Sequence, residues 1–334
     1  MRIAINGFGR IGKLVFRAYL ERKIKNAKVV AINELGSFDS SFHLLNFDSS
    51  HGALKANINK QKNGIKYKND VINFYSEKDP SNLPWKKLNI DLVLECSGMF
   101  NSKEKATKHI HAGAKKVIIS APANDADVTV VQGVNNQILN SKHIIISNGS
   151  CTTNCLAPVA MLIDNNLGIE SGFMTTVHSF TGDQRTIDQN HNDLRRARTA
   201  SLAMIPTSTG AAKALSLVLP NLKGKLDGTA IRVPTPNVSL IDFTFTSKKK
   251  TSVEKINNIM IKNSKNKKMK NILGINKLPL VSIDFNHSPF SSIFDVTQTQ
   301  VVNSNFCRIL SWYDNEWAFS NRMIDTMLDL RKFL

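Results

Sequence analysis

Short apolar runs alternate with amphipathic stretches over the first 150 residues of the chain. The runs 2–6, 28–33 and 91–96 are mostly apolar and have the length of buried strands. Between the first two, the segment 13–20 repeats apolar residues at helical spacing. Strands that alternate with helices predict an α/β fold with a doubly wound parallel sheet, which binds ligands at the carboxyl ends of its strands.

The periodicity changes after Gly172. The segments 173–178 and 238–246 alternate apolar and polar residues, which is typical of strands with one buried face. They predict a second, α+β domain with a mostly antiparallel or mixed sheet. Between them, the segment 181–199 is polar and basic and has little periodicity, so we expect a functional loop there.

The C-terminal segment 320–333 predicts an amphipathic helix, because Met323, Met327 and Leu330 share one helical face. A length of 334 residues favours two domains, since single cores rarely grow beyond ~250–300 residues. We expect the first domain to span residues 1–150, the second 151–314, and a C-terminal helix within 315–334 to return to the first.

A glycine-rich turn links the first predicted strand to the first predicted helix. Gly7, Gly9 and Gly12 form the pattern G-x-G-x-x-G, which permits a tight turn, close approach of the backbone to a pyrophosphate and close helix packing. Glu34 ends the second predicted strand, where a carboxylate accepts hydrogen bonds from the adenosine ribose hydroxyls. The pattern predicts a Rossmann-type dinucleotide site. The carboxylate favours NAD over NADP because it repels a 2′-phosphate.

A cysteine lies where another apolar run, 144–146, leads into a predicted helix. Ser150 is a favourable N-cap, and apolar residues follow at helical spacing from Leu156. The N–H groups at a helix N-terminus favour negative charge, so we expect Cys151 to ionise readily and to act as a nucleophile. The alternative is that Cys151 is a small buried apolar residue, which is the commoner role of cysteine.

Composition narrows the classes of function. An apolar fraction of 42% with 21% charged residues is ordinary for a globular protein. The four cysteines have neither the number nor the spacing of a disulfide framework or a zinc site, and we expect no bound metal. No secretion signal or membrane-spanning apolar run is visible, so we expect a cytoplasmic protein with no membrane partner.

The formal net charge of +18 would suit a partner rich in phosphate. However, the excess lysines lie in segments that are also rich in asparagine and isoleucine, such as 57–63 and 262–268. No basic motif interleaved with aromatic residues accompanies them. We interpret the charge as a compositional bias and expect no nucleic-acid partner, with a basic RNA-binding protein as the remote alternative.

Together, these motifs resemble those of the phosphorylating glyceraldehyde-3-phosphate dehydrogenases of the bacterial type. The resemblance covers essentially the whole chain and rests on His178 and on the segments 5–12, 48–52, 150–155, 205–214, 232–237 and 312–317. It implies oxidation of D-glyceraldehyde 3-phosphate to 1,3-bisphosphoglycerate with NAD and inorganic phosphate, a reaction of glycolysis and gluconeogenesis. It also implies a homotetramer.

The resemblance assigns roles to two residues. Cys151 attacks the aldehyde to form a thiohemiacetal and then a thioester, and His178 takes the hydroxyl proton. We expect His178 to form an ion pair with the Cys151 thiolate, which would lower the pKa of the thiol further.

The resemblance also implies two anion sites and a cofactor site. The residues indicated for the phosphate of the substrate are Thr181, Asp183 and Arg232. Those indicated for the attacking phosphate are Ser150, Thr152, Thr209, Gly210 and Arg195, with the adjoining Arg196 as the alternative to Arg195. Those indicated for NAD are Gly9, Arg10, Ile11, Glu34, Lys78, Ser97, Ser120 and Asn315.

Two features bear on specificity. Gln189 and Asn190 stand where NAD-only members often have an apolar residue and a proline, so the expected preference for NAD rests mainly on Glu34. The related erythrose-4-phosphate dehydrogenases share the Cys/His pair but usually lack the runs 181–183 and 208–210. Both runs are present here, which favours the phosphorylating dehydrogenase over this alternative.

Overall fold

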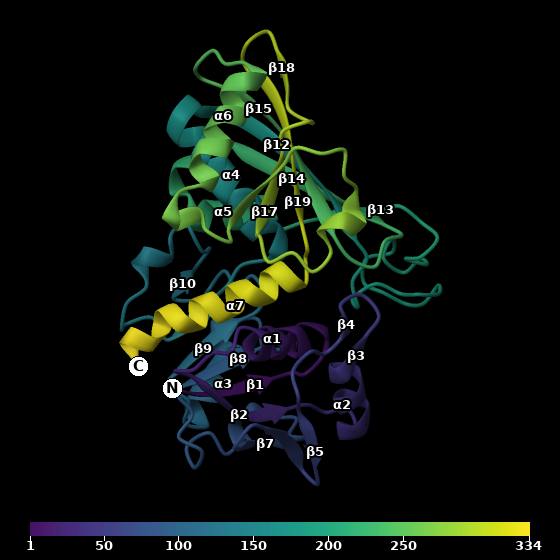
Figure 1. The fold of residues 1–334 in the computed structure, drawn as a ribbon, viewed down its shortest axis with the longest axis vertical. Helices are drawn as coiled ribbons and strands as arrows, with labels where there is room; N and C mark the ends of the chain where they lie inside the picture. The colour runs from purple at the N-terminus through teal and green to yellow at the C-terminus, as the bar shows by residue number, and fades with distance from the viewer. The chain divides into compact units, whose positions relative to one another are not determined.

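The computed structural model describes residues 1–334 as two compact units (Figure 1). The first unit consists of Met1–Val130, Asn136–Gly149 and Ser320–Leu334, and the second of Val131–Asn135 and Ser150–Phe319. These boundaries differ in three places from those that the sequence predicts. Ser150 belongs to the second unit instead of the first. Residues 131–135 join the second unit, and the C-terminal segment of the first unit begins at residue 320 instead of 315.

A nine-stranded sheet forms the centre of the first unit. Its strand order is β10-β11-β9-β8-β1-β2-β7-β6-β5, and every neighbouring pair from β10 to β7 is parallel. The strands are β1 (Arg2–Asn6), β2 (Lys28–Asn33), β5 (Asn59–Gln61), β6 (Gly64–Tyr67), β7 (Asp70–Tyr75), β8 (Leu92–Glu95), β9 (Lys116–Ile119), β10 (Val128–Thr129) and β11 (Ile145–Ser147). The predicted doubly wound parallel sheet is confirmed, with β5 and β6 as an antiparallel extension.

Helices connect the parallel strands, and shorter elements complete the first unit. These elements are α1 (Arg10–Glu21), α2 (Phe38–Asn46), α3 (Lys103–His111), β3 (Phe47–Asp48), β4 (Gly52–Ala53) and the 3₁₀ turns Pro80–Asn82, Asn136–Ile138 and Arg331–Phe333. The strand order reverses between β1 and β8, which lie side by side with a helix after each. Such a reversal leaves a crevice at the carboxyl ends of the strands, where these sheets bind ligands.

A mixed sheet forms the second unit. Its order is β13-β14-β12-β15-β19-β17-β16, and β18 pairs with β19. The strands are β12 (Ile169–Ser179), β13 (Ile205–Ser208), β14 (Leu226–Val233), β15 (Ser239–Ser247), β16 (Leu273–Asn276), β17 (Ser292–Asp295), β18 (Gln300–Val302) and β19 (Phe306–Tyr313). The predicted mixed sheet is confirmed, because β12 is parallel to β14 but antiparallel to β15.

Three helices cover one face of this mixed sheet (Figure 1). They are α4 (Cys151–Leu167), α5 (Ala211–Val218) and α6 (Val253–Ser264), with 3₁₀ turns at Pro220–Leu222, Lys267–Met269 and Ser282–Phe285. Leu156, Val159 and Ile163 of α4 pack on Phe243 and Ile309 of the sheet, and all five side chains are buried. This burial stabilises α4 and holds its N-terminus at one edge of the core.

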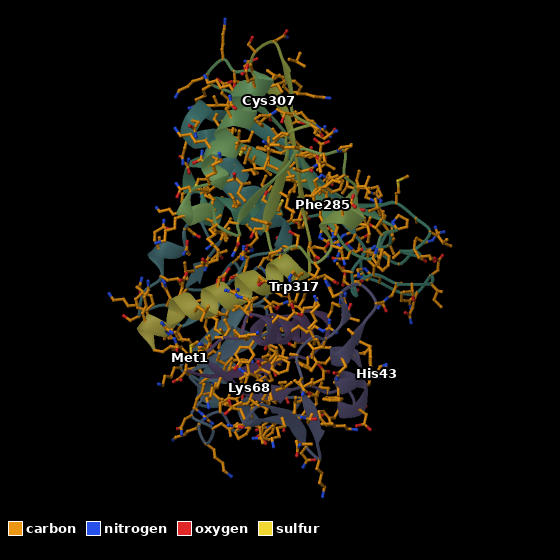
Figure 2. The ribbon with its side chains drawn as sticks, viewed as in Figure 1. Met1, His43, Lys68, Phe285, Cys307 and Trp317 are labelled. Carbon is orange, nitrogen blue, oxygen red and sulfur yellow. The ribbon has the colours of Figure 1, made fainter.

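The C-terminal helix α7 (Trp317–Leu330) begins at Trp317, which Figure 2 labels, three residues before the predicted start. Met323, Met327 and Leu330 are completely buried, so the predicted apolar face is confirmed. Within the first unit, Asp325 forms an ion pair with Arg22 of the loop after α1. No helix combines the length and the apolar character that crossing a bilayer requires.

Candidate active site

Cys151 is the first residue of α4, the helix whose apolar face packs on the mixed sheet. Gly149 precedes it with φ of 64°, a left-handed conformation that suits glycine. Ser150 caps the helix, because its Oγ accepts a hydrogen bond from the Thr153 N–H at 3.0 Å. The sequence prediction of a cysteine at a capped helix N-terminus is confirmed, and the N–H groups of this terminus point toward the thiol.

His178 lies beside Cys151 near the end of β12. Its Nε2 is 3.5 Å from Cys151 Sγ, and its Nδ1 is 2.7 Å from the carbonyl oxygen of Ser179. Two groups meet Nδ1: the Ser179 carbonyl, which can only accept, and Arg232 Nη1 at 3.0 Å, which can only donate. The contact to Ser179 is the shorter one, and Arg232 Nη1 has another acceptor in the same carbonyl at 3.2 Å, so the geometry favours the proton on Nδ1. This tautomer leaves the Nε2 lone pair directed at the thiol, as a general base requires.

The environment of the pair penalises charge on either partner. Burial of the ring, and then the positive charge of Arg232, lowers the pKa of His178 to about 3. Burial raises the pKa of the Cys151 thiol, although Arg232 and the N–H groups of the helix start oppose this effect. These directions disfavour the predicted thiolate–imidazolium ion pair, because burial is the largest contribution to both pKa values.

Arg232 stands next to His178 because β12 and β14 are parallel neighbours, with His178 and Arg232 in register. Its Nη1 donates to the Ser179 carbonyl at 3.2 Å and lies 3.5 Å from Thr181 Oγ1. Its buried Nε has no hydrogen-bond partner. A partly buried guanidinium with an unpaired N–H is suited to bind an anion. The structure thus brings together two of the residues predicted for the substrate phosphate.

Asp183, the third residue predicted for that phosphate, pairs with an arginine. Arg196 Nη1 donates to Asp183 Oδ2 at 2.7 Å, and Arg196 Nε donates to Thr207 Oγ1 at 3.1 Å. A carboxylate repels phosphate, so this geometry makes Asp183 a residue that orients Arg196. Arg195, in contrast, has an exposed side chain in an open hollow of the surface, and only its backbone N–H bonds to Asp193. The loop therefore places Arg196, not Arg195, within the hydrogen-bonded cluster.

The other predicted anion ligands lie at two helix starts. Thr209 and Gly210 precede α5, where Thr209 Oγ1 accepts from the Ala211 N–H at 3.3 Å. Thr152 lies in the first turn of α4, and its hydroxyl is 2.9 Å from the hydroxyl of Tyr313. Sequence reasoning did not single out Tyr313, whose buried ring meets His178 edge-on at a centroid distance of 5.9 Å. The sequence did contain a signal for Tyr313, because this residue belongs to the segment 312–317, one of those on which the family resemblance rests.

The first unit has a hollow of about 400 Å³ at the carboxyl ends of β1, β2 and β8. Among the predicted cofactor residues, Gly9, Glu34, Lys78 and Ser97 line it. Arg10 and Ile11 begin α1 next to the glycine turn, and Ser120 follows β9 without lining the hollow. Sequence reasoning missed other residues that line it, namely Asn6, Asn33, Leu35, Glu77, Cys96, Met99 and Phe100.

The hollow has the features that a dinucleotide needs. A Cβ on Gly12 would lie 2.0 Å from the Gly7 carbonyl oxygen, so only glycine permits this turn, whereas a Cβ on Gly9 would meet nothing within 4 Å. Gly9 thus leaves its backbone open to a ligand. Glu34 accepts from the Phe8 N–H at 2.6 Å and the Gly36 N–H at 3.0 Å, which fixes its carboxylate at the rim. These residues fit an NAD molecule.

Comparison with known proteins places this geometry in a family. The family model of the glyceraldehyde 3-phosphate dehydrogenase NAD binding domain matches residues 1–103, and that of the C-terminal domain matches residues 150–315. The chain is 53% identical over 332 residues to the glyceraldehyde-3-phosphate dehydrogenase of Xanthobacter flavus, covering 99% of both proteins. It is 52% identical over 335 residues to that of Zymomonas mobilis, covering 100% of this chain and 99% of the relative. The chain belongs to the glyceraldehyde-3-phosphate dehydrogenase family.

Asn315, one of the predicted cofactor residues, belongs to the second unit. Asn315 is buried, and its Oδ1 accepts hydrogen bonds from the hydroxyls of Ser179 and Ser239, each at 2.9 Å. These bonds fix the orientation of the Asn315 amide.

All four cysteines are free, and no group of three or more His, Cys, Asp or Glu side chains could hold a metal ion. Cys307, labelled in Figure 2, is buried at the far end of β19 from Tyr313.

Proposed function

We propose that this chain oxidises D-glyceraldehyde 3-phosphate to 1,3-bisphosphoglycerate, with NAD as the oxidant and inorganic phosphate as the acyl acceptor, in glycolysis or gluconeogenesis. The observation that carries the proposal is the Cys151–His178 pair, 3.5 Å apart at the N-terminus of α4 and next to Arg232. A thiol, a general base and a guanidinium are the groups that an aldehyde carrying a phosphate requires.

The reaction begins at Cys151. Its sulfur bonds to the aldehyde carbon, the thiol proton passes to His178 Nε2, and the carbonyl oxygen takes that proton to give a thiohemiacetal. When NAD is bound, the glycine turn and Glu34 would hold it, and it would supply the acceptor for the hydride that leaves the thiohemiacetal carbon. His178 Nε2 removes the hydroxyl proton as the thioester forms on Cys151.

The second half of the reaction releases the acyl group. An oxygen of inorganic phosphate bonds to the thioester carbon, and the carbon–sulfur bond breaks. His178 returns its proton to the leaving Cys151 sulfur, so that both side chains regain their starting states. The Nε2 atom lies 3.5 Å from the sulfur, so the same atom can serve both directions of this proton transfer.

Two anion sites serve these steps. We assign the phosphate of the substrate to Arg232 and Thr181, with support from the unpaired Nε of Arg232 and its contact to Thr181. We assign the attacking phosphate to Ser150, Thr152, Thr209, Gly210 and an arginine of the 181–199 loop. The contacts of Arg196 with Asp183 and Thr207 favour Arg196 over Arg195 for this arginine.

A coupled assay of NADH formation tests the proposal. We expect turnover with glyceraldehyde 3-phosphate that depends on inorganic phosphate, and much less with erythrose 4-phosphate. Turnover that is equal with and without phosphate, and fastest with erythrose 4-phosphate, would instead identify an erythrose-4-phosphate dehydrogenase.

The nucleophile has its own test. Cys151→Ser should abolish aldehyde oxidation and remove the fast-reacting thiol in iodoacetamide labelling, because a hydroxyl is a far weaker nucleophile near neutral pH. Cys155→Ser is the matched control, since Cys155 is buried one turn further along α4. An active Cys151→Ser variant would exclude the thioester route.

We also propose that the chain forms a homotetramer and acts in the cytoplasm without membrane or nucleic-acid partners. The support for assembly is a set of exposed apolar side chains in and after the 181–199 loop: Ile187, Leu194, Leu202 and Met204, each more than 70% exposed. Such side chains are typical of subunit interfaces. Sedimentation should give a mass of about four times 37.1 kDa, and a monomer at micromolar concentration would contradict the assembly.

A further inference from the structure

A buried polar network lies behind the wall of the cofactor hollow. At its centre is Glu95, the last residue of β8, which has no exposed surface. Its Oε1 accepts from the N–H and the hydroxyl of Ser97, at 2.7 and 2.5 Å. Its Oε2 lies 2.6 Å from Asn6 Nδ2 and 2.8 Å from His109 Nε2. Every partner of this carboxylate thus presents a nitrogen or a hydroxyl.

The direction of each hydrogen bond is determined at the outer ends of the network. An indole N–H can only donate, so Trp85 Nε1, 3.0 Å from His109 Nδ1, makes Nδ1 an acceptor. The proton of His109 is then on Nε2, which donates to Glu95. His109 is neutral in this arrangement, although it touches a carboxylate and is completely buried.

The hydrogen bonds of the other two arms of the network also donate toward Glu95. The backbone N–H of Glu77 donates to Asn33 Oδ1 at 2.8 Å, which turns Asn33 Nδ2 toward Asn6 Oδ1, also at 2.8 Å. Asn6 Nδ2 must then donate to Glu95. Similarly, the Met99 N–H donates to Ser97 Oγ at 3.1 Å, so the Ser97 hydroxyl proton points to Glu95. All these chains of donors end at one carboxylate, which must be ionised to accept them.

The network joins the walls of the hollow. Asn6 ends β1, Asn33 ends β2, and Ser97 and Met99 belong to the loop after β8; all four line the hollow, together with Glu77. Neither Glu95 nor His109 lines it. Glu95 therefore acts on the cofactor only through the residues that it orients.

We propose that Glu95 is a positioning residue for NAD, and that His109 and Trp85 are the arm that keeps its carboxylate fully hydrogen-bonded. This inference rests on the proposed function only in taking NAD as the occupant of the hollow. Replacing the Glu95 carboxylate by an amide puts an NH₂ donor in the position of one of the two oxygens, and both of these positions face only donors. An NH₂ group would face the Ser97 N–H on one side, or the Asn6 and His109 donors on the other, and none of these can reverse without breaking the next bond of its chain.

The test compares NAD dissociation constants, measured by titration calorimetry on the full-length protein. We expect Glu95→Gln to weaken NAD binding at least about tenfold, the loss that corresponds to one hydrogen bond to a charged group. His109→Gln should bind NAD almost as well as the wild type, because the amide N–H replaces the Nε2–H donor. His109→Leu removes that donor and should weaken binding.

Two controls separate a loss of NAD positioning from a general loss of folding. In each variant, the rate of Cys151 alkylation without NAD should match that of the wild type, because Cys151 belongs to the second unit. The thermal midpoint of His109→Gln should also match that of the wild type. An NAD dissociation constant of Glu95→Gln within twofold of the wild-type value would overturn the proposal. Equal NAD dissociation constants for His109→Gln and His109→Leu would also overturn it. If Glu95→Gln does not fold, the His109 pair decides. A wild type that binds NAD but does not oxidise the aldehyde would contradict the proposed function and leave this comparison intact.

Discussion

At the scale of single residues, adjacent arginines of the 181–199 loop have different environments. The side chain of Arg196 is mostly buried and bonds to Asp183, whereas that of Arg195 is exposed. A charge that is already desolvated and oriented binds an anion more strongly than one that is solvated and mobile. The two residues therefore form a natural pair of test and control variants.

The arginine pair gives a kinetic prediction. Arg196→Ala should weaken the dependence of steady-state turnover on inorganic phosphate and leave the acylation burst largely intact, with a loss corresponding to about 1.5–3 kcal/mol. Arg195→Ala should stay close to the wild type. Burst kinetics at varied phosphate concentration measure both effects. If Arg195→Ala has the larger effect, our choice of arginine is mistaken.

His178 gives a prediction about acid stability. Its pKa is about 3 in the folded protein, against about 6.5 in an unfolded chain, so between these values only the unfolded state binds the proton. As the pH falls from 6.5 toward 3, this group lowers the free energy of unfolding by about 1.4 kcal/mol for each pH unit. His178→Asn lacks this proton and should lose stability less steeply. Urea unfolding of both proteins between pH 4.5 and 7 measures the slopes, and parallel slopes would refute the assignment.

At the scale of elements, helix α4 performs two tasks. Its apolar side chains pack on the sheet, and its N-terminus presents Cys151. The position of the thiol therefore depends on where the helix begins, and Ser150 determines that point by bonding to the Thr153 N–H. The N–H groups at a helix start favour negative charge, which explains why the predicted reactive cysteine coincides with a predicted helix start.

Removal of the cap tests this dependence. Ser150→Ala should lower the free energy of unfolding by about 1 kcal/mol, because one N–H of the first turn loses its acceptor. Ser150→Thr keeps a hydroxyl oxygen and serves as the control. Denaturation midpoints give the comparison, and an alanine variant as stable as the wild type would show that the cap is not needed.

At the scale of the whole molecule, the features that bear on cofactor choice are divided between the units. Glu34 belongs to the first unit, while Gln189 and Asn190 belong to the second. Only Glu34 has a direct physical argument, because its carboxylate lines the hollow and is fixed by two backbone N–H groups. Charge repulsion of a 2′-phosphate should therefore dominate the choice.

The corresponding prediction concerns NADP. The wild type should prefer NAD. Glu34→Gln removes the charge but keeps the shape of the side chain, so it should narrow the difference in kcat/KM between NAD and NADP. Glu34→Ala should narrow it further and also weaken NAD binding, because the Phe8 and Gly36 N–H groups lose their acceptor. Equal use of both cofactors by the wild type would show that Gln189 and Asn190 outweigh Glu34.

The sequence by itself determined those features that depend on local physics. The spacing of glycines 7, 9 and 12 indicates a tight turn, the apolar run 28–33 indicates a buried strand, and Ser150 before an apolar periodic segment indicates a helix start. Each of these signals lies within a few residues, so it is readable without knowing the rest of the fold. The family motifs added the pairing of Cys151 with His178, which local patterns could not supply.

Only the tertiary structure decided which distant residues meet and how their charges interact. The ion pair expected for Cys151 and His178 is disfavoured because the folded chain buries both groups and places Arg232 beside the imidazole. Arg196 rather than Arg195 joins Asp183 because of how the irregular loop folds, which no periodicity encodes. Likewise, Glu95 and His109 read in the sequence as ordinary polar residues. They form a buried network only because parallel strands bring the ends of β1, β2 and β8 together.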